Sequence, residues 1–169
     1  RESSYGAGNQ YRCHIGTFPR PRAVVPAGGK PGETVSVKFT GDIAGEMTQS
    51  ITLPAAAGDD FAIYPEDGVG IAPSGLPFRL SPLENVIEAE PNNTLAEATK
   101  GPSPAAFNGL LQAPGDIDFF GFTATKGQAY DIHVYARRLR SELDPVLTVY
   151  NEKGGGLGNN DDTGGPDSY

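Results

Sequence analysis

Residues 35–40 read VSVKFT, and in this stretch Val35, Val37 and Phe39 alternate with polar residues. A period of two is typical of a β-strand that buries one face and exposes the other. Comparable short runs recur between glycines and prolines, namely QSITLP, FAIYP, FNGLL, DIDFFGFTA, AYDIHVYA and PVLTVY. Helix signal is limited to TLAEATK, where Thr94 and Glu97 have the spacing of a capping box. The sequence therefore predicts an all-β fold of short strands.

The composition supports many turns and an acidic surface. Of the 169 residues, 23 are glycine and 15 are proline, roughly twice the usual share of these two residues. The formal net charge is -8, which argues against nucleic acid and anionic membranes as partners and is compatible with divalent cations. No run approaches the ~20 apolar residues of a membrane-spanning helix, so we expect no membrane insertion.

The spacing of prolines and strand signals predicts three segments. Residues 1–18 are expected to form a terminal strand, with Cys13, the single cysteine, as a small buried core residue. Prolines at 19, 21 and 26 then begin an extended connector. We expect an immunoglobulin-like β-sandwich over residues 19–84 and a second β-sandwich over residues 85–169, joined near SPLENVIEAEPNNT.

The junction segment EAEPNNT and the later GDID are rich in oxygen ligands. Hard cations such as calcium take six to eight oxygens from carboxylates, amides and backbone carbonyls. An extended segment places alternate side chains on one side, so these residues form a candidate metal site: Glu88, Glu90, Asn92, Asn93, Asp116 and Asp118. The alternative is a linker followed by an aspartate turn, with Asn93 or Thr94 capping one helical turn.

A second acidic cluster surrounds the glycine-rich segment near residue 160. Its carboxylates repel one another unless a cation or the nearby arginines 137, 138 and 140 neutralise them. The alternative to a metal is therefore an arginine–aspartate network that ties a long loop to the sheet. The members of this second candidate site are Asp144, Asn160, Asp161, Asp162 and Asp167.

The sequence offers little for catalysis. The motifs G-x-S-x-G and H-E-x-x-H are absent, and neither histidine, His14 or His133, stands in a catalytic context. We therefore expect a protein that is not an enzyme, with no catalytic or cofactor-binding residues apart from the candidate calcium ligands.

The second half of the chain resembles the bacterial pre-peptidase C-terminal (PPC) domain. The motifs that carry the resemblance are EPNNT, GDIDFFGF, KGQ, ARRL, LDPVLTVY and NDD, all within residues 85–169. The opening PAGGKPGETVSV of the preceding segment is similar to immunoglobulin-like domains of the IPT/TIG type. Residues 10–16, QYRCHIG, look like the ending of another PPC domain, which indicates alternating modules in tandem.

The resemblance implies a jelly-roll-like, non-catalytic module of an exported bacterial protein, with calcium near the EPN segment. Asn93 stands where many relatives have aspartate, which implies a weaker ion site. The chain starts without methionine and the second sandwich lacks its last two strands. We therefore expect an excerpt of a longer protein, in which the N-terminal strand completes that sandwich in cis or in trans.

The expected function is a structural or adhesive module, stabilised by calcium, outside the cytoplasm, where it is secreted, periplasmic or at the cell surface. Its partners would be neighbouring domains of the same polypeptide and an extracellular polymer or protein. The alternative is an accessory or propeptide-like domain of a secreted hydrolase, acting in targeting, folding or binding of a polymeric substrate.

Overall fold

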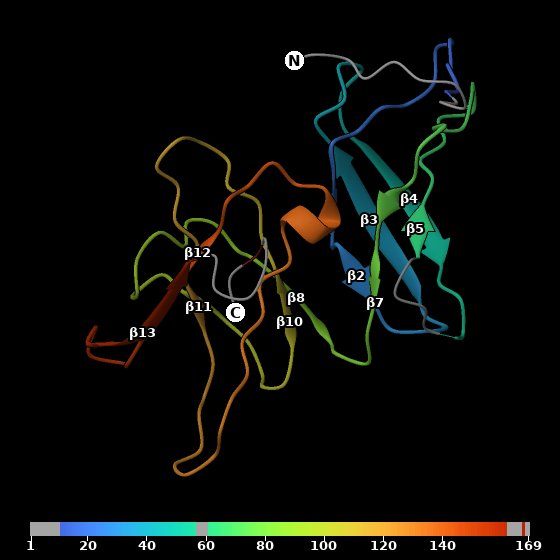
Figure 1. Ribbon diagram of the computed structural model, residues 1–169. Helices are drawn as coiled ribbons and strands as arrows, with labels where there is room; N and C mark the ends of the chain where they lie inside the picture. The colour runs from blue at the N-terminus through green and yellow to red at the C-terminus, as the bar shows by residue number, and fades with distance from the viewer. Residues whose placement is uncertain (1–10, 57–60, 162–166, 168–169) are drawn as a thin grey trace.

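The computed structural model describes residues 11–56, 61–161 and 167 (Figure 1). Short strands dominate this part of the chain, and the helical content is one 3-10 helix, η1 (Arg137–Leu139). The prediction of an all-β fold is confirmed. Strands β1 to β7 pair only with one another, and so do β8 to β13. We refer to residues 11–81 as the N-terminal lobe and to residues 82–167 as the C-terminal lobe.

The N-terminal lobe is built around an antiparallel sheet in the order β1-β3-β4. Val35, Val37 and Phe39 occupy β3 and face the interior, as their alternation predicted. Two short pairs complete the lobe, β2 with β7 in parallel and β5 with β6 in antiparallel orientation. The strand bounds are β1 (Ala23–Val25), β2 (Gly28–Gly29), β3 (Thr34–Thr40), β4 (Met47–Thr52), β5 (Ala62–Ile63), β6 (Leu76–Pro77) and β7 (Arg79–Leu80).

One apolar core holds the N-terminal lobe together. Val37 and Phe39 are fully buried, and Phe78 packs edge-on against Phe61 with 6.2 Å between the ring centroids. Removing such side chains from water is the main stabilising contribution to folding. The buried members of this core are Val24, Val37, Phe39, Leu53, Ile63 and Phe78.

The C-terminal lobe consists of two-stranded pairs. β8 pairs with β10, and β9 with β11, both in parallel, while β12 and β13 form an antiparallel ribbon. The parallel pairs place the end of β8 beside the end of β10, and this brings distant segments together. The bounds are β8 (Asn85–Ile87), β9 (Thr99–Lys100), β10 (Ala106–Asn108), β11 (Phe120–Gly121), β12 (Val146–Tyr150) and β13 (Gly156–Asp161).

Three local expectations differ from the structure. Residues 130–134 show the expected alternation of burial, but Tyr135 is half-buried as well, and residues 130–136 form no strand. The glycine-rich stretch 156–161, expected as a loop, is strand β13, because it pairs with β12. Residues 11–16 form no strand, and Cys13 is exposed, so the expectation of a buried strand cysteine is wrong.

Candidate metal centre

Backbone hydrogen bonds bring the two predicted acidic segments together. The N–H of Phe119 donates to the carbonyl of Asn92 (2.9 Å), and the N–H of Ile117 donates to Oδ1 of Asn93 (3.3 Å). On the other side, the N–H of Glu88 donates to the carbonyl of Asn108 (2.9 Å) at the end of the β8–β10 pair. EAEPNN therefore runs between GDID and the end of β10.

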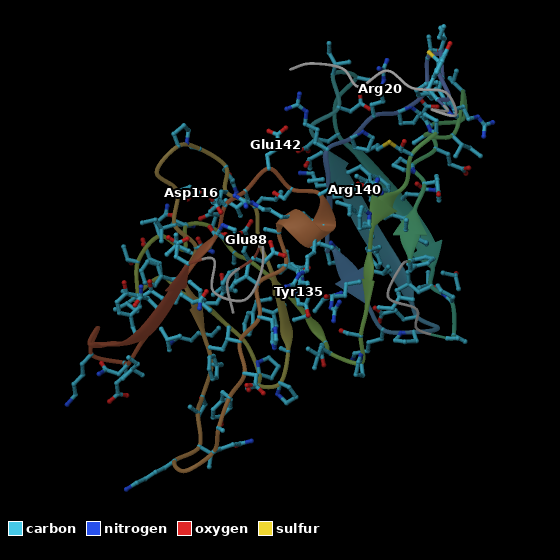
Figure 2. All side chains as sticks on the ribbon, in the orientation of Figure 1. Arg20, Glu88, Asp116, Tyr135, Arg140 and Glu142 are labelled. Atoms are coloured by element: carbon cyan, nitrogen blue, oxygen red, sulfur yellow. The ribbon has the colours of Figure 1, made fainter. Side chains whose placement is uncertain are left out.

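Three carboxylates converge at this place. Each of Glu88, Glu90 and Asp118 offers an oxygen atom, and these oxygens lie within 4.8 Å of one another. Glu88 and Asp118 are partly buried, and Glu90 is exposed. Figure 2 shows Glu88 in the C-terminal lobe with Asp116 labelled nearby. No ion pair among the described residues involves these three carboxylates. The cluster thus concentrates negative charge without a cationic side chain to balance it.

Several oxygens of the cluster are buried without a partner. Glu88 accepts a hydrogen bond at Oε1 from the N–H of Leu110 (2.7 Å), but among the described residues its Oε2 has no hydrogen-bond partner, and neither has Oδ1 of Asp118. The side-chain amide of Asn92 is fully buried and also unpartnered, while its backbone N–H donates to Oε2 of Glu90 (2.9 Å). Buried polar atoms in this state are destabilising unless a ligand, ion or water satisfies them.

Burial raises the pKa of two carboxylates of the cluster, Glu88 and Asp118. Desolvation raises the pKa of Glu88 to about 7, with a further contribution from the charge of Asp118, against the lowering effect of the Leu110 N–H. Desolvation and the charge of Asp116 likewise raise the pKa of Asp118. Near neutral pH, either a proton or a cation can therefore relieve the repulsion between the two carboxylates.

The donor set fits a hard cation. All available donors are carboxylate or amide oxygens, which calcium and magnesium prefer, and no thiolate or imidazole is part of the cluster. Glu88, Glu90 and Asp118 would hold the ion, with Asn92 as a further donor. An open hollow of about 400 Å³ beside the cluster, lined in part by Glu90 and Asp116, leaves room for water ligands.

Two of the six predicted residues, Asn93 and Asp116, bond to the backbone of the surrounding loops. Oδ2 of Asp116 accepts the N–H of Gln112 (2.6 Å), and Asn93 holds Ile117 as described above. Both residues shape the loops around the cluster. The structure thus brings three of the six predicted residues together as a carboxylate cluster and places the other three directly around it.

Gly109 is a part of this site that the sequence analysis missed. A Cβ atom at this position would lie 2.5 Å from Oε2 of Glu88 and 2.6 Å from Oδ2 of Asp118. Only glycine allows both carboxylates to approach the backbone so closely. The sequence did contain a signal for this role, namely the glycine at position 109 in FNGLL. A glycine in or beside a strand often marks a place where another group approaches the backbone closely.

Two members of the second acidic cluster, Asp144 and Asp167, contact arginine side chains and backbone N–H groups. Asp144 pairs with Arg137, with 2.7 Å between Oδ1 and Nη2. Asp167 is buried and accepts the backbone N–H groups of Ala136, Arg137 and Arg138 at 3.2, 2.6 and 3.3 Å. Nε of Arg138 lies 3.6 Å from the same carboxylate. These contacts tie Asp167 to the start of η1.

The remaining residues of the second cluster lie on or beyond β13. Asn160 pairs with Leu147 and Asp161 with Val146 in the β12–β13 ribbon. Asp161 is exposed. Asp162 lies outside the described residues. Within the described part of the chain, Asn160 and Asp161 thus belong to the β12–β13 ribbon, and Asp144 and Asp167 bind groups around η1.

Comparisons with known proteins give one partial similarity. The chain is 35% identical over 93 residues to a protein named probable subtilase-type serine protease from Deinococcus radiodurans. This similarity covers 51% of the present chain and 12% of that protein, so the chain spans about an eighth of the relative that it matches. No family model matches the chain. No solved structure matches it either.

These comparisons are compatible with a PPC-like domain of a larger protein, which stays a prediction. Among the described residues there is no helix with the length and apolar character needed to cross a membrane.

Proposed function

We propose that this chain is a non-catalytic accessory segment of a larger exported protein, and that a calcium ion bound by Glu88, Glu90 and Asp118 stabilises it. The observation that carries the proposal is the convergence of three carboxylates with buried oxygens that lack partners. A divalent cation would neutralise the charge of the cluster and satisfy Oε2 of Glu88 and Oδ1 of Asp118 at the same time.

The parent of this segment is proposed to be a secreted protease. The partial similarity to a subtilase-type serine protease supports this class. The segment would act beside the catalytic domain, in its folding or in substrate capture. The coding region on either side of this sequence tests the parent class. A subtilase-type catalytic domain encoded there would support the proposal. A parent protein that contains only β modules would contradict it and would favour a structural or adhesive module instead.

Thermal unfolding in calcium and in chelator tests the ion. A ligand that binds only the folded state stabilises it by about 2.7 kcal/mol at a concentration of 100 times its Kd. We expect the unfolding midpoint of the full chain to rise with free calcium. The variant Glu88→Gln keeps the acceptor for the Leu110 N–H but removes the charge, so it should lose this rise.

A matched control comes from Glu152, which is exposed in the turn between β12 and β13 and is not a member of the carboxylate cluster. Glu152→Gln makes the same change of charge and should keep the full calcium response. Calcium binding would be refuted by a wild-type midpoint that does not change with calcium, together with no calcium in elemental analysis of the protein.

A further inference from the structure

The two lobes meet through specific polar contacts. At the start of β2, the backbone N–H of Ala27 donates to Oδ1 of Asn108 (3.0 Å), and the carbonyl of Gly28 accepts from Nδ2 of Asn85 (2.8 Å). Nδ2 of Asn108 also donates to Oδ1 of Asn85 (3.1 Å). The two asparagines thus form a bonded pair that holds two consecutive backbone groups of the opposite lobe.

This pair adds hydrogen bonds at β2 and at the residue before it to those that β2 makes with β7. On its other side, β2 already pairs with β7, because the N–H groups of Arg79 and Ser81 donate to the carbonyls of Ala27 and Gly29. The side-chain amides of Asn85 and Asn108 therefore take the place that a neighbouring strand would have. Ala27, Gly28 and both asparagines are partly buried, and a partly buried backbone group that loses its partner is destabilised.

Arginine contacts add to the junction at two further places. The guanidinium of Arg79 on β7 lies over the ring of Tyr135, with 4.0 Å between Cζ and the ring centroid. Nη1 of Arg140, which follows η1, donates to the carbonyl of Gly75 (3.1 Å). Figure 2 shows Arg140 and Tyr135 between the strands of the two lobes.

The backbone of Arg140 forms the C-cap of η1, and its N–H donates to the carbonyl of Arg137 (2.9 Å). Its φ angle of 64° lies in the left-handed region, and Arg140 is the one non-glycine residue of the described ranges with positive φ. Residues other than glycine adopt this conformation rarely, and it persists where the surroundings hold it in place. Here it accompanies the hydrogen bond of the side chain to the N-terminal lobe.

We propose that the Asn85–Asn108 pair, together with Arg79 and Arg140, joins the two lobes into one rigid unit with a fixed orientation. Relative motion is the usual behaviour of neighbouring domains with a modest polar interface. The junction here instead uses hydrogen bonds of 2.8 and 3.0 Å from two side chains that are themselves bonded to each other. The rigid unit would then keep a constant distance and angle between the parts of a larger protein on its two sides. This proposal does not depend on calcium or on a protease parent.

Residual dipolar couplings of the full chain in a dilute aligned medium test this orientation. In the wild-type protein, the couplings of both lobes should fit a single alignment tensor. The double variant Asn85→Ala/Asn108→Ala should lose the common tensor, so that each lobe fits a tensor of its own. A wild-type protein that needs two tensors, or a folded double variant that keeps one, would overturn the proposal.

A matched control and a milder variant complete the test. Oδ1 of Asn151 accepts the N–H groups of Lys153 and Gly155 in the turn of the β12–β13 ribbon, and Asn151 makes none of the junction contacts described above. Asn151→Ala should therefore keep the single tensor. If the double variant unfolds its C-terminal lobe, Arg140→Ala decides the question. Separate tensors in this variant support the rigid junction, and an unchanged single tensor contradicts a role for Arg140 in it.

Discussion

The two lobes of this chain bury different kinds of groups. The N-terminal lobe encloses an apolar core of six buried residues around Phe39. In the described part of the C-terminal lobe, the buried apolar residues are Ala136 and Pro145, whereas Asn92 and Asp167 are buried and polar. Apolar burial is insensitive to pH and ions, but buried polar groups depend on their partners. The stability of the C-terminal lobe should therefore depend on pH and ions, and that of the N-terminal lobe should not.

The largest effect is expected from a substitution in the apolar core of the N-terminal lobe. Phe39→Ala removes a ring that is fully buried and should lower the free energy of unfolding by about 3–5 kcal/mol. Urea unfolding of the full chain measures this loss. The control Phe122→Ala removes a ring from the C-terminal lobe that is 37% exposed, and its loss should be clearly smaller. Equal losses in the two variants would contradict the contrast between the lobes.

An intermediate effect is expected at the buried carboxylate of the C-terminal lobe. Asp167→Asn removes the charge that accepts three backbone N–H groups, and hydrogen bonds to charged groups contribute about 1.5–3 kcal/mol. We expect a loss of that order in urea unfolding. Asp144→Asn is the matched control, because Asp144 and its partner Arg137 are exposed and such pairs contribute about 0–1 kcal/mol. A loss for Asp167→Asn no larger than for the control would argue against its role.

The smallest effect concerns the pH dependence of stability without calcium. Burial raises the pKa of Glu88 from 4.5 to about 7, so between these values the folded state holds a proton that the unfolded state releases. Stability in chelator should therefore fall as pH rises through this window. Calcium should remove the decline, since it replaces the proton. Urea titrations at a series of pH values measure the slope.

Glu88→Gln sharpens this test. The variant cannot titrate at position 88, so its stability in chelator should change less with pH than that of the wild type. A slope as steep as in the wild type would assign the pH dependence to other groups, such as Asp118, whose pKa burial also raises.

The sequence predicted the strands that carry their own alternating pattern. Val35, Val37 and Phe39 were enough to identify β3, because one face of that strand is buried in the core. The alternation of apolar and polar residues did not predict strands correctly where the pairing of two distant segments decides whether a strand forms. Residues 156–161 form β13 through pairing with β12, whereas residues 130–134 alternate in burial but form no strand within the part of the chain that the structure describes. A single sequence does not reveal such long-range pairing.

The candidate metal centre was also predicted in part. The acidic residues of EAEP and GDID were identified from their chemistry, but which of them meet depends on loop bonds such as those of Asn92 to Phe119 and of Asn93 to Ile117. The junction asparagines gave no signal, because Asn85 and Asn108 act through contacts that are 57 and 81 residues away in the chain. Local reasoning identifies the composition of such sites better than their geometry.

The close approach at Gly109 has a consequence for reading and engineering related sequences. Since a Cβ atom there would meet both Glu88 and Asp118, a chain with both acids but a bulkier residue at the corresponding position would have to splay them apart. A sequence pattern used to find this cluster in related proteins should therefore include the glycine as well as the acidic residues. It also offers a way to adjust the spacing of the two carboxylates by side-chain size alone, at constant charge.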